Sequence, residues 1–191
     1  MPPNVLLLGI QGSGKGTQAK RIASEYDSPH VATGDILRKA IEDGTPLGKQ
    51  VDDILARGEL VPDATMIDLI RERLTDTEGF VLDGFPRTMA QAEALDDMLA
   101  EINRPLDVVF VLQVPDDVAR ERLAKRALAE GRADDTPAAI DTRIATYHRE
   151  TEPIVEHYRT RGSLVGIPGT GTVEEVFRQI QDALDQVAVR Q

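Results

Sequence analysis

Short apolar runs recur along the chain, and segments with helical periodicity separate them. The runs with the length and composition of buried strands lie at 5–8, 80–82, 108–114, 164–167 and, with a weaker signal, 30–32. Strands that alternate with helices predict βαβ crossovers, and these produce a largely parallel sheet with helices on both faces. The pattern therefore predicts an α/β fold with three layers.

The C-terminal segment carries the clearest helix signal. Thr172 and Glu175 form a capping-box pattern, and apolar residues follow at helical spacing from Val173 to Val187. This predicts a helix that packs on the sheet.

Two stretches fit the sheet pattern less well. Residues 32–61 are helical but interrupted by glycine, and residues 126–135 are polar and rich in Ala and Gly. We expect both to be peripheral flaps on a single domain, because no linker or repeat divides the chain. The core of that domain would comprise 1–31, 62–125 and 136–191. Flaps at strand ends are where an open α/β sheet places its ligand site.

Composition narrows the class of protein. The 191 residues include 33 acidic and 22 basic side chains, which gives a net charge of −11, and there is no cysteine. Disulfides, a thiol nucleophile and Cys-ligated zinc are thereby excluded. No apolar stretch approaches the roughly 20 residues of a membrane span, so we expect a cytoplasmic protein without membrane or nucleic-acid partners. Any polyanion that it binds must meet a local cluster of cations.

The first apolar run leads into a glycine-rich segment that ends in a lysine. Residues 9–17, GIQGSGKGT, satisfy the pattern Gly-x-x-x-x-Gly-Lys between a strand and a helix. Glycines let backbone N–H groups cradle phosphates, the helix adds its positive end, and Lys15 reaches the β- and γ-phosphates. Gly16 stands where a generic loop has Ser or Thr, so the hydroxyl that would touch magnesium moves to Thr17.

Two further segments carry candidate chemistry, each with a simpler alternative. In TGDILR, residues 33–38, Thr33 is a plausible helix N-cap and Arg38 follows in an early turn, which also fits a capped helix with a surface arginine. In LDGFPR, residues 82–87, Asp83 ends an apolar strand, where P-loop enzymes place a magnesium-organising carboxylate. Asp83 also fits a turn-capping role.

Arginines gather in the next part of the chain. Arg122 and Arg126 share one helix face at i, i+4, and Arg132 and Arg143 follow. Composition alone favours a solvated face, because acidic residues are interspersed. Planar guanidinium groups nevertheless match the charge that a transferring phosphoryl group spreads over its oxygens.

The glycine-rich loop, the TGDILR segment, the DGFPR segment and the later arginines together resemble the adenylate kinase family of nucleoside monophosphate kinases, in the family's order and over essentially the whole chain. The resemblance implies a P-loop fold with a helical AMP-binding flap at 32–61 and a short lid at 126–135. It also implies a monomer that catalyses the magnesium-dependent reaction ATP + AMP ⇌ 2 ADP in adenine nucleotide homeostasis, with in-line transfer and no covalent intermediate.

Site residues follow from the resemblance position by position. The implied ATP-binding residues are Gly12, Ser13, Gly14, Lys15, Gly16, Thr17, Arg122, Arg126 and Gly171. The implied AMP-binding residues are Thr33, Arg38, Glu59, Leu60, Val61, Gly84, Phe85, Pro86, Arg87, Gln91, Arg132 and Arg143. The implied catalytic residues are Lys15, Arg87, Arg122, Arg126, Arg132 and Arg143. Mg²⁺ would be organised through water by Asp83, with Thr17 nearby.

Gln91 has two interpretations. Thr88 and Gln91 form a capping-box pattern, in which the Gln91 side chain would bond the backbone N–H of Thr88. The family resemblance instead places Gln91 against the adenine of AMP, and we favour that contact.

The lid predicted here is short and free of zinc. Only about nine positions separate Arg126 from Asp135, where long-lid relatives carry an insertion that is often stapled by zinc through cysteines, and this chain has no cysteine. Asp134 and Asp135 match the Asp pair of the short-lid pattern. Closure of the flaps should exclude water and prevent ATP hydrolysis.

Two rival functions stay open at this point. A UMP/CMP-type kinase is the rival within the class, although Thr33 and Gln91 favour adenine. A nucleotide-binding regulatory switch is the rival outside it, although no guanine-recognition motif of the Asn/Thr-Lys-x-Asp type is present. No general base is needed, because the AMP phosphate is already anionic, so we expect structural or exposed roles for the histidines His30, His148 and His157.

Overall fold

The computed structural model describes residues 2–75, 77–132 and 134–188. Met1, Asp76, Ala133 and residues 189–191 belong to the predicted core and lid ranges and lie outside the described residues.

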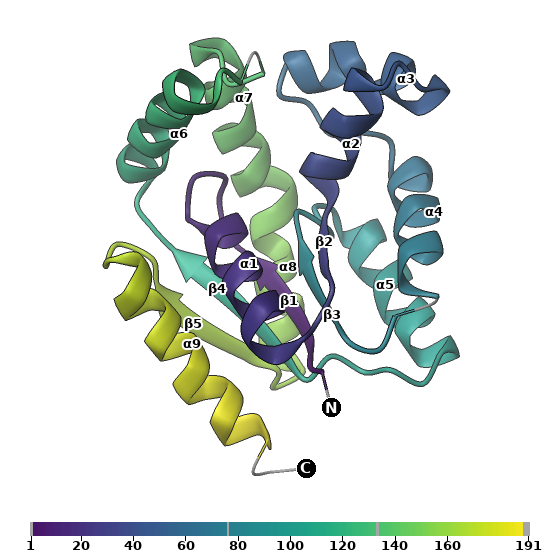
Figure 1. Cartoon of the computed structure of the whole chain (residues 1–191), viewed down its shortest axis with the longest axis vertical. Coiled ribbons are helices and arrows are strands. Elements are labelled where there is room, and N and C mark those ends of the chain that lie inside the picture. The colour runs from purple at the N-terminus through teal and green to yellow at the C-terminus, as the bar shows by residue number, and fades with distance from the viewer. Residues whose placement is uncertain (1, 76, 133, 189–191) are drawn as a thin grey trace.

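A five-stranded sheet forms the centre of the described part of the chain, and each neighbouring pair of strands is parallel (Figure 1). The strands are β1 (Asn4–Leu8), β2 (His30–Ala32), β3 (Phe80–Asp83), β4 (Val108–Gln113) and β5 (Leu164–Pro168). Their order is β2-β3-β1-β4-β5. The predicted fold class is confirmed, and each predicted strand differs from the observed one by at most one residue at either end.

Helices follow the strands as the periodicity predicts. They are α1 (Lys15–Tyr26), α2 (Thr33–Glu42), α3 (Pro46–Ala56), α4 (Asp63–Leu74), α5 (Met89–Glu101), α6 (Asp116–Glu130), α7 (Pro137–Thr146), the π-helical turn η1 (Tyr147–Thr151), α8 (Glu152–Thr160) and α9 (Val173–Ala188).

The alternation of side chains along β1 creates two cores. Leu6 and Leu8 pack with α4, α5 and α8 on one face of the sheet, whereas Val5 and Leu7 pack with α1 and α9 on the other. Successive residues of a strand point to opposite faces, so a strand that is apolar at every position must be covered on both sides. The three layers follow from this pattern.

The predicted capping box of α9 is present. The backbone N–H of Glu175 donates to Thr172 Oγ1 at 3.2 Å, and the backbone N–H of Thr172 donates to Glu175 Oε2 at 2.8 Å. Two otherwise unpaired helix donors are thereby satisfied.

Two helical pairs stand beyond the carboxyl ends of the strands. Figure 1 shows α2 and α3 above β2 and β3, and α6 and α7 above β1 and β4. A third apolar cluster, which includes Ile10, Leu123 and Ile140, joins the loop after β1 to α6 and α7. The edge of the sheet where β1, β3 and β4 end therefore lies beneath both pairs.

Candidate functional site

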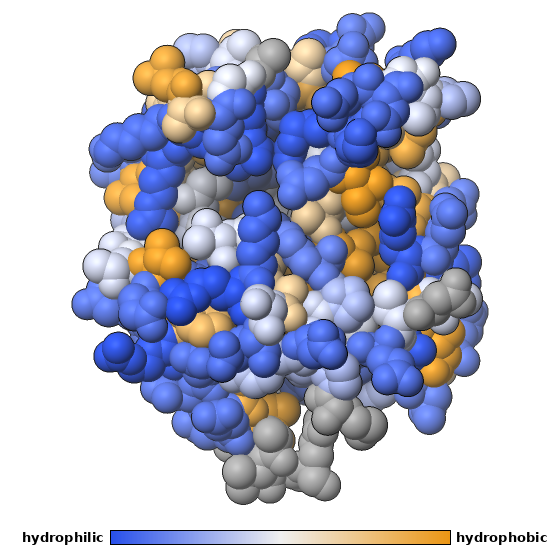
Figure 2. Space-filling model, in the orientation of Figure 1, coloured by the Kyte–Doolittle hydropathy of each residue, from blue (hydrophilic) through white to orange (hydrophobic). Residues whose placement is uncertain are grey.

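A cavity of about 370 Å³ opens at this edge of the sheet. Its walls come from the loop after β1, the start of α2, the end of β3, and helices α6 and α7, so segments far apart in sequence meet there. Figure 2 shows that the surface is hollowed between the two upper helical pairs, with hydrophobic surface gathered along one side of the hollow. The predicted residues that line the cavity are Gly12, Gly14, Lys15, Gly16, Thr17, Thr33, Arg38, Glu59, Leu60, Val61, Asp83, Gly84, Pro86, Arg87, Gln91, Arg122, Arg126, Arg132 and Arg143.

The glycine-rich loop takes a conformation that its glycines permit. Gly12 and Gly14 have φ angles of 84° and 98°, in the left-handed region that other residues rarely adopt. A Cβ on Gly12 would also lie 2.6 Å from the backbone oxygen of Ala119 in α6. The loop runs directly into the N-terminus of α1, where unpaired N–H groups and the helix dipole favour an anion.

Lys15 is the first residue of α1 and faces back into the loop. Its Nζ donates hydrogen bonds to the backbone oxygens of Gly9 at 2.7 Å and Ile10 at 2.9 Å. Burial lowers the pKa of Lys15 from 10.5 to about 8, because the loss of water disfavours the charged amine, and the nearby cations Arg87 and Arg126 lower it further against the opposing charge of Asp83. The amine is thus held by neutral acceptors, ready for an anion.

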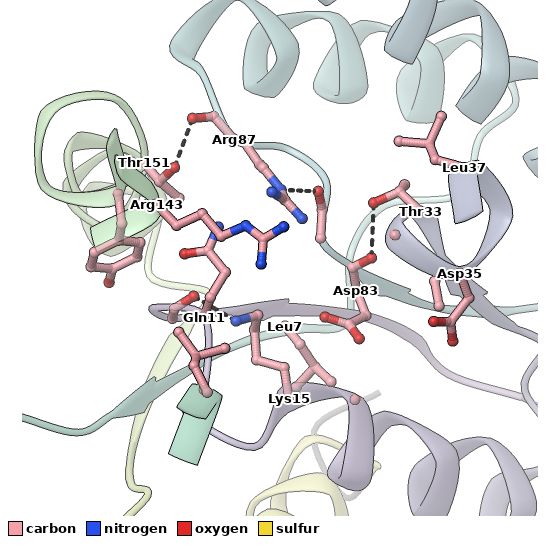
Figure 3. Close-up of a pocket in the computed structure, with 18 of the residues that line it drawn as sticks. Leu7, Gln11, Lys15, Thr33, Asp35, Leu37, Asp83, Arg87, Arg143 and Thr151 are labelled. Atoms are coloured by element: carbon pink, nitrogen blue, oxygen red, sulfur yellow. Dashed lines mark hydrogen bonds between the residues drawn. The ribbon is translucent and has the colours of Figure 1, made fainter. Parts of the chain in front are cut away.

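Asp83 lies at the end of β3, facing Lys15 (Figure 3). Burial by itself raises its pKa, but the neighbouring His30 and the charges of Lys15 and Arg87 hold the pKa of Asp83 below its ordinary value of 3.8. The His30 Nε2 lies 3.7 Å from Asp83 Oδ2. Gly16 is close as well, since a Cβ there would lie 3.3 Å from the same oxygen.

Asp83 beside the phosphate loop fits a magnesium–phosphate complex. Within residues 2–75, 77–132 and 134–188, no cluster of three or more His, Cys, Asp or Glu side chains could hold a metal ion. Mg²⁺ in phosphoryl-transfer sites is bound by one or two carboxylates, waters and the substrate phosphates rather than by a protein cage. A single ionised carboxylate beside the phosphate loop matches that pattern.

Arg87 reaches the cavity from the turn after β3. Its Nε donates to the backbone oxygen of Gly84 at 2.7 Å, and Thr151 Oγ1 donates to the backbone oxygen of Arg87 at 2.8 Å (Figure 3). Burial lowers the pKa of Arg87 to about 10, opposed by Asp83 and assisted by Arg143 and other arginines. Gly84 has a φ of 88°, and a Cβ there would lie 2.6 Å from Thr33 Oγ1, so this turn requires glycine.

Two arginines on the opposite wall, Arg126 and Arg143, are held by two carboxylates. Arg126 donates two parallel hydrogen bonds to Asp135, at 2.7 and 2.9 Å. Arg143 donates to Asp135 and, at 2.7 Å, to Asp134. Arg38, which comes from α2, donates to Asp35 at 2.5 Å, and its Nη1 lies 3.7 Å from Asp134 Oδ2. The Asp135 side chain is fully buried; burial alone would raise its pKa, but hydrogen bonds and charge from Arg126 and Arg143 hold the pKa below 3.8.

Arg122 and Arg132 complete the charged lining. Arg122 Nη1 donates to the backbone oxygen of Gly169 at 2.9 Å, which ties α6 to the loop before α9. Arg132 Nε donates to Glu130 at 2.6 Å. Arg122 and Arg126 share one face of α6, as their i, i+4 spacing predicts, and both line the cavity.

Three predicted site residues do not line the cavity, and one predicted helix cap is wrong. Ser13 and Phe85 are buried and, like Gly171, do not line the cavity. The prediction of Thr33 as an N-cap is wrong: Ala32 holds that position, and Thr33, the first residue of α2, donates its hydroxyl to the backbone oxygen of Asp83 at 3.3 Å. An acceptor on the adjacent strand competes successfully with the helix end.

The Gln91 side chain departs from the capping-box interpretation. Thr88 is the N-cap of α5 and accepts from the Gln91 backbone N–H at 3.2 Å. Gln91 Oε1, however, accepts from the backbone N–H of Arg87 at 2.8 Å rather than from that of Thr88. Its Nε2 donates to Asp63 Oδ1 at 2.8 Å.

The structure also adds residues that sequence reasoning missed. Leu37, Leu55 and Met66 give the cavity an apolar wall beside Glu59, Leu60 and Val61, and their helical periodicity was the available signal. Thr151 and Asp63 reach Arg87 and Gln91 from distant parts of the chain. No local pattern marks either of these two.

Comparison with known proteins agrees with the fold. Residues 7–163 match the family model described as adenylate kinase. The chain is 46% identical to an adenylate kinase of Xylella fastidiosa (strain 9a5c) over 183 residues, 94% of this chain and 98% of the relative. It is 47% identical over 186 residues to an adenylate kinase of Cyanothece sp. (strain PCC 7425 / ATCC 29141), covering 96% and 95% of the two chains. For that of Xanthomonas euvesicatoria pv. vesicatoria (strain 85-10), identity is 44% over 183 residues.

A parallel α/β sheet with a phosphate loop and an arginine-lined cavity defines a P-loop nucleotide phosphotransferase. The chain belongs to the adenylate kinase family. Among the residues that the structure describes, no helix is long and apolar enough to cross a membrane.

Proposed function

We propose that the cavity at the carboxyl edge of the sheet binds ATP and AMP together and transfers the γ-phosphoryl group between them. The observation that carries the proposal is the convergence of the phosphate loop, Asp83 and the arginines on one cavity. Cations that would repel one another elsewhere are useful where two polyanions must be brought into contact.

In this proposal the chain acts by positioning and by electrostatics. Gly12 to Thr17 hold the ATP phosphates, with Lys15 on the phosphates nearest the transfer. Arg87 and Arg38 hold the AMP phosphate. The lid-side arginines Arg122, Arg126, Arg132 and Arg143 stabilise the charge on the transferring group. The AMP oxygen attacks in line, the bond to the ADP oxygen breaks, and no proton acceptor is required.

Asp83 is the residue that would organise the metal ion. Asp83 would hold Mg²⁺ through water, with Thr17 nearby, and the ion would neutralise charge on the ATP phosphates. Asp83 is ionised in its environment, because the neighbouring His30 and the charge of Lys15 keep its pKa low. Zinc has no role in this proposal, since the chain contains no cysteine.

The apolar side of the cavity fits the AMP base. Leu37, Leu55 and Met66 offer hydrophobic surface, and Gln91 offers a carboxamide among them. We propose residues 32–61 as the AMP-binding flap and 126–135 as the short lid, which close over the nucleotides and exclude water. A cytoplasmic monomer is the form that we predict.

The test is to measure ADP formation from ATP plus AMP in a coupled assay, with and without EDTA. We expect rapid ADP formation that EDTA abolishes and excess Mg²⁺ restores. Replacement of AMP by CMP or UMP tests the pyrimidine kinase alternative, and turnover with either pyrimidine at the AMP rate would overturn the assignment. Stable ATP binding without any ADP formation would favour a regulatory switch instead.

A further inference from the structure

The Gln91 carboxamide is buried and held in one orientation by two groups of opposite character. Gln91 is 2% exposed, its Oε1 accepts from the backbone N–H of Arg87 at 2.8 Å, and its Nε2 donates to Asp63 Oδ1 at 2.8 Å. A backbone N–H can only donate and a carboxylate can only accept. A flip of the amide would therefore set donor against donor at Arg87 and acceptor against acceptor at Asp63.

Asp63 is the second of the two partners that fix the Gln91 amide, and it comes from a different helix. It is the first residue of α4, and its Oδ1 also accepts from the Thr88 hydroxyl at 3.0 Å. Gln91 lines the cavity, whereas Asp63 does not. The carboxylate thus acts on a ligand only through the amide that it orients.

The amide oxygen keeps one lone pair and the amide nitrogen one N–H for a ligand. An amide oxygen has two lone pairs and an amide nitrogen two hydrogens, and the protein uses one of each. The remaining acceptor lies on the Arg87 side and the remaining donor on the Asp63 side. Adenine presents the complementary order, an N6 amino donor beside the N1 acceptor. Hypoxanthine presents the reverse, an O6 acceptor beside an N1–H donor.

We propose that Asp63 is a positioning residue for base specificity, which locks the Gln91 amide in the orientation that accepts adenine and rejects a 6-oxopurine. The proposal rests on the proposed function, because it places the AMP base against Gln91. With Asp63 in place, inosine monophosphate in the same pose would face like groups at both atoms. Buried polar groups that face no partner weaken binding strongly.

The experiment compares AMP with inosine monophosphate as phosphoryl acceptors from ATP. We expect the wild-type protein to prefer AMP in kcat/KM by at least about a hundredfold. Asp63→Ala should lower that preference roughly tenfold, through a higher KM for AMP and a lower KM for inosine monophosphate. The KM for ATP and the kcat with saturating AMP should change by less than about twofold, because Asp63 does not line the cavity.

Two variants separate orientation from stability. Asp63→Asn keeps an oxygen that can accept from Gln91 Nε2, so the preference for AMP should remain near the wild-type ratio. Thr88→Val removes the hydroxyl that caps α5 and bonds Asp63, so Tm should fall while the ratio persists. If the ratio of kcat/KM for AMP to that for inosine monophosphate fell in proportion to Tm across the three variants, the proposal would be overturned.

Other outcomes also decide whether Asp63 positions the Gln91 amide. An unchanged ratio in Asp63→Ala, or the same loss in Asp63→Asn, would also overturn it. If Asp63→Ala does not fold, the wild-type protein still decides: equal use of AMP and inosine monophosphate excludes a locked amide. Dissociation constants for both monophosphates, measured by calorimetry, report the ratio without turnover. Failure of ADP formation with a preserved binding ratio would therefore refute the proposed function alone.

Discussion

The two walls of the cavity hold their cations in different ways. On the phosphate-loop side, Lys15 and Arg87 donate to backbone oxygens, at 2.7–2.9 Å and 2.7 Å respectively. On the lid side, Arg126 and Arg143 donate to the carboxylates of Asp134 and Asp135. A carbonyl is a dipole without net charge, whereas a carboxylate neutralises the cation that it binds.

This difference indicates that the two walls bind phosphates in different ways. The phosphate-loop cations keep their charge for the ligand, and burial makes that charge unfavourable until an anion arrives, as the lowered pKa values of Lys15 and Arg87 indicate. Arg126 and Arg143 are already neutralised, so phosphates must compete with Asp134 and Asp135 for them. One wall is organised in advance, and the other must exchange partners when nucleotides bind.

The largest effect is expected when the phosphate-loop wall loses its lysine. Lys15→Ala should lower kcat/KM for ATP by at least about a hundredfold, because a charge aimed at the phosphates disappears from a water-poor site. Its Tm should stay level or rise, since the folded protein disfavours the charged amine that is removed. Steady-state kinetics and thermal unfolding measure the two quantities.

The matched control is Lys125→Ala. Lys125 is exposed on α6 and pairs with Glu121, so both activity and Tm should remain near the wild-type values. If Lys15→Ala lost several degrees of Tm, Lys15 would be a structural cation, and the contrast between the two walls would be wrong.

The second effect concerns stability on the lid wall. Asp135→Asn should lower the free energy of unfolding by about 3 kcal/mol at neutral pH, because two arginines lose their shared buried carboxylate. The pKa of Asp135 is lowered in the folded state, so its contribution is present above pH 3.8 and is lost as the pH falls through the lowered pKa. Urea unfolding at several pH values tests both the size and the direction.

Asp134→Asn is the partner variant. The Asp134 side chain is 14% exposed and has one close arginine partner, Arg143, so its loss should cost only about 1 kcal/mol. Equal losses for the two variants would show that burial does not distinguish the two aspartates.

Local sequence patterns predict the phosphate loop better than the contacts between helices. The phosphate loop and Asp83 depend on neighbours in sequence: a strand, a glycine-rich turn and a helix start. The Arg122–Gly169 contact joins residues 47 positions apart, and the Gln91–Asp63 contact joins residues 28 positions apart. Those contacts depend on how helices pack, which no local pattern contains.

The error at Thr33 has the same origin. Its position after a strand predicts an N-cap, and the propensity of Thr for that role is real. Parallel pairing of β2 with β3 brings the backbone oxygen of Asp83, 50 positions away, within reach of the hydroxyl. Strand register therefore decided a contact that local propensity could not.

A pH profile sharpens the contrast on the phosphate-loop side. The pKa of Lys15 is about 8 in the free protein, so kcat/KM for ATP should fall roughly tenfold per pH unit above about pH 8, as the amine loses its charge. The kcat at saturating nucleotides should fall only at higher pH, because bound phosphates favour the charged amine. Phosphate monoesters lose their second proton near pH 6, so AMP itself does not change above neutral pH.

This result is measured by a coupled assay in overlapping buffers of constant ionic strength. A kcat/KM that stayed flat to about pH 9.5 would contradict the effect of burial on Lys15. A decline in kcat and kcat/KM at the same pH would mean that phosphates do not act on the amine.

The smallest effect extends the comparison to the surface, where carboxylates again hold a cation. His148 lies 2.9 Å from Glu152 and 3.0 Å from Asp116, linking the starts of α8 and α6, and its side chain is 43% exposed. Hydrogen bonds to these carboxylates, Glu152 first and then Asp116, raise the pKa of His148 above 6.5. A raised pKa means that the charged form stabilises the folded protein below pH 6.5, and that this contribution is lost as the pH rises through the folded-state value.

His148→Gln should therefore cost about 0.5 kcal/mol at about pH 6 and nothing at about pH 9, since water and salt screen an exposed pair. Urea unfolding at both pH values measures the difference, and added salt should shrink the loss at the lower pH. A loss of equal size at both values would mean that His148 contributes by packing rather than by charge. A loss as large as that of Asp135→Asn would mean that burial is not what makes the lid carboxylates strong.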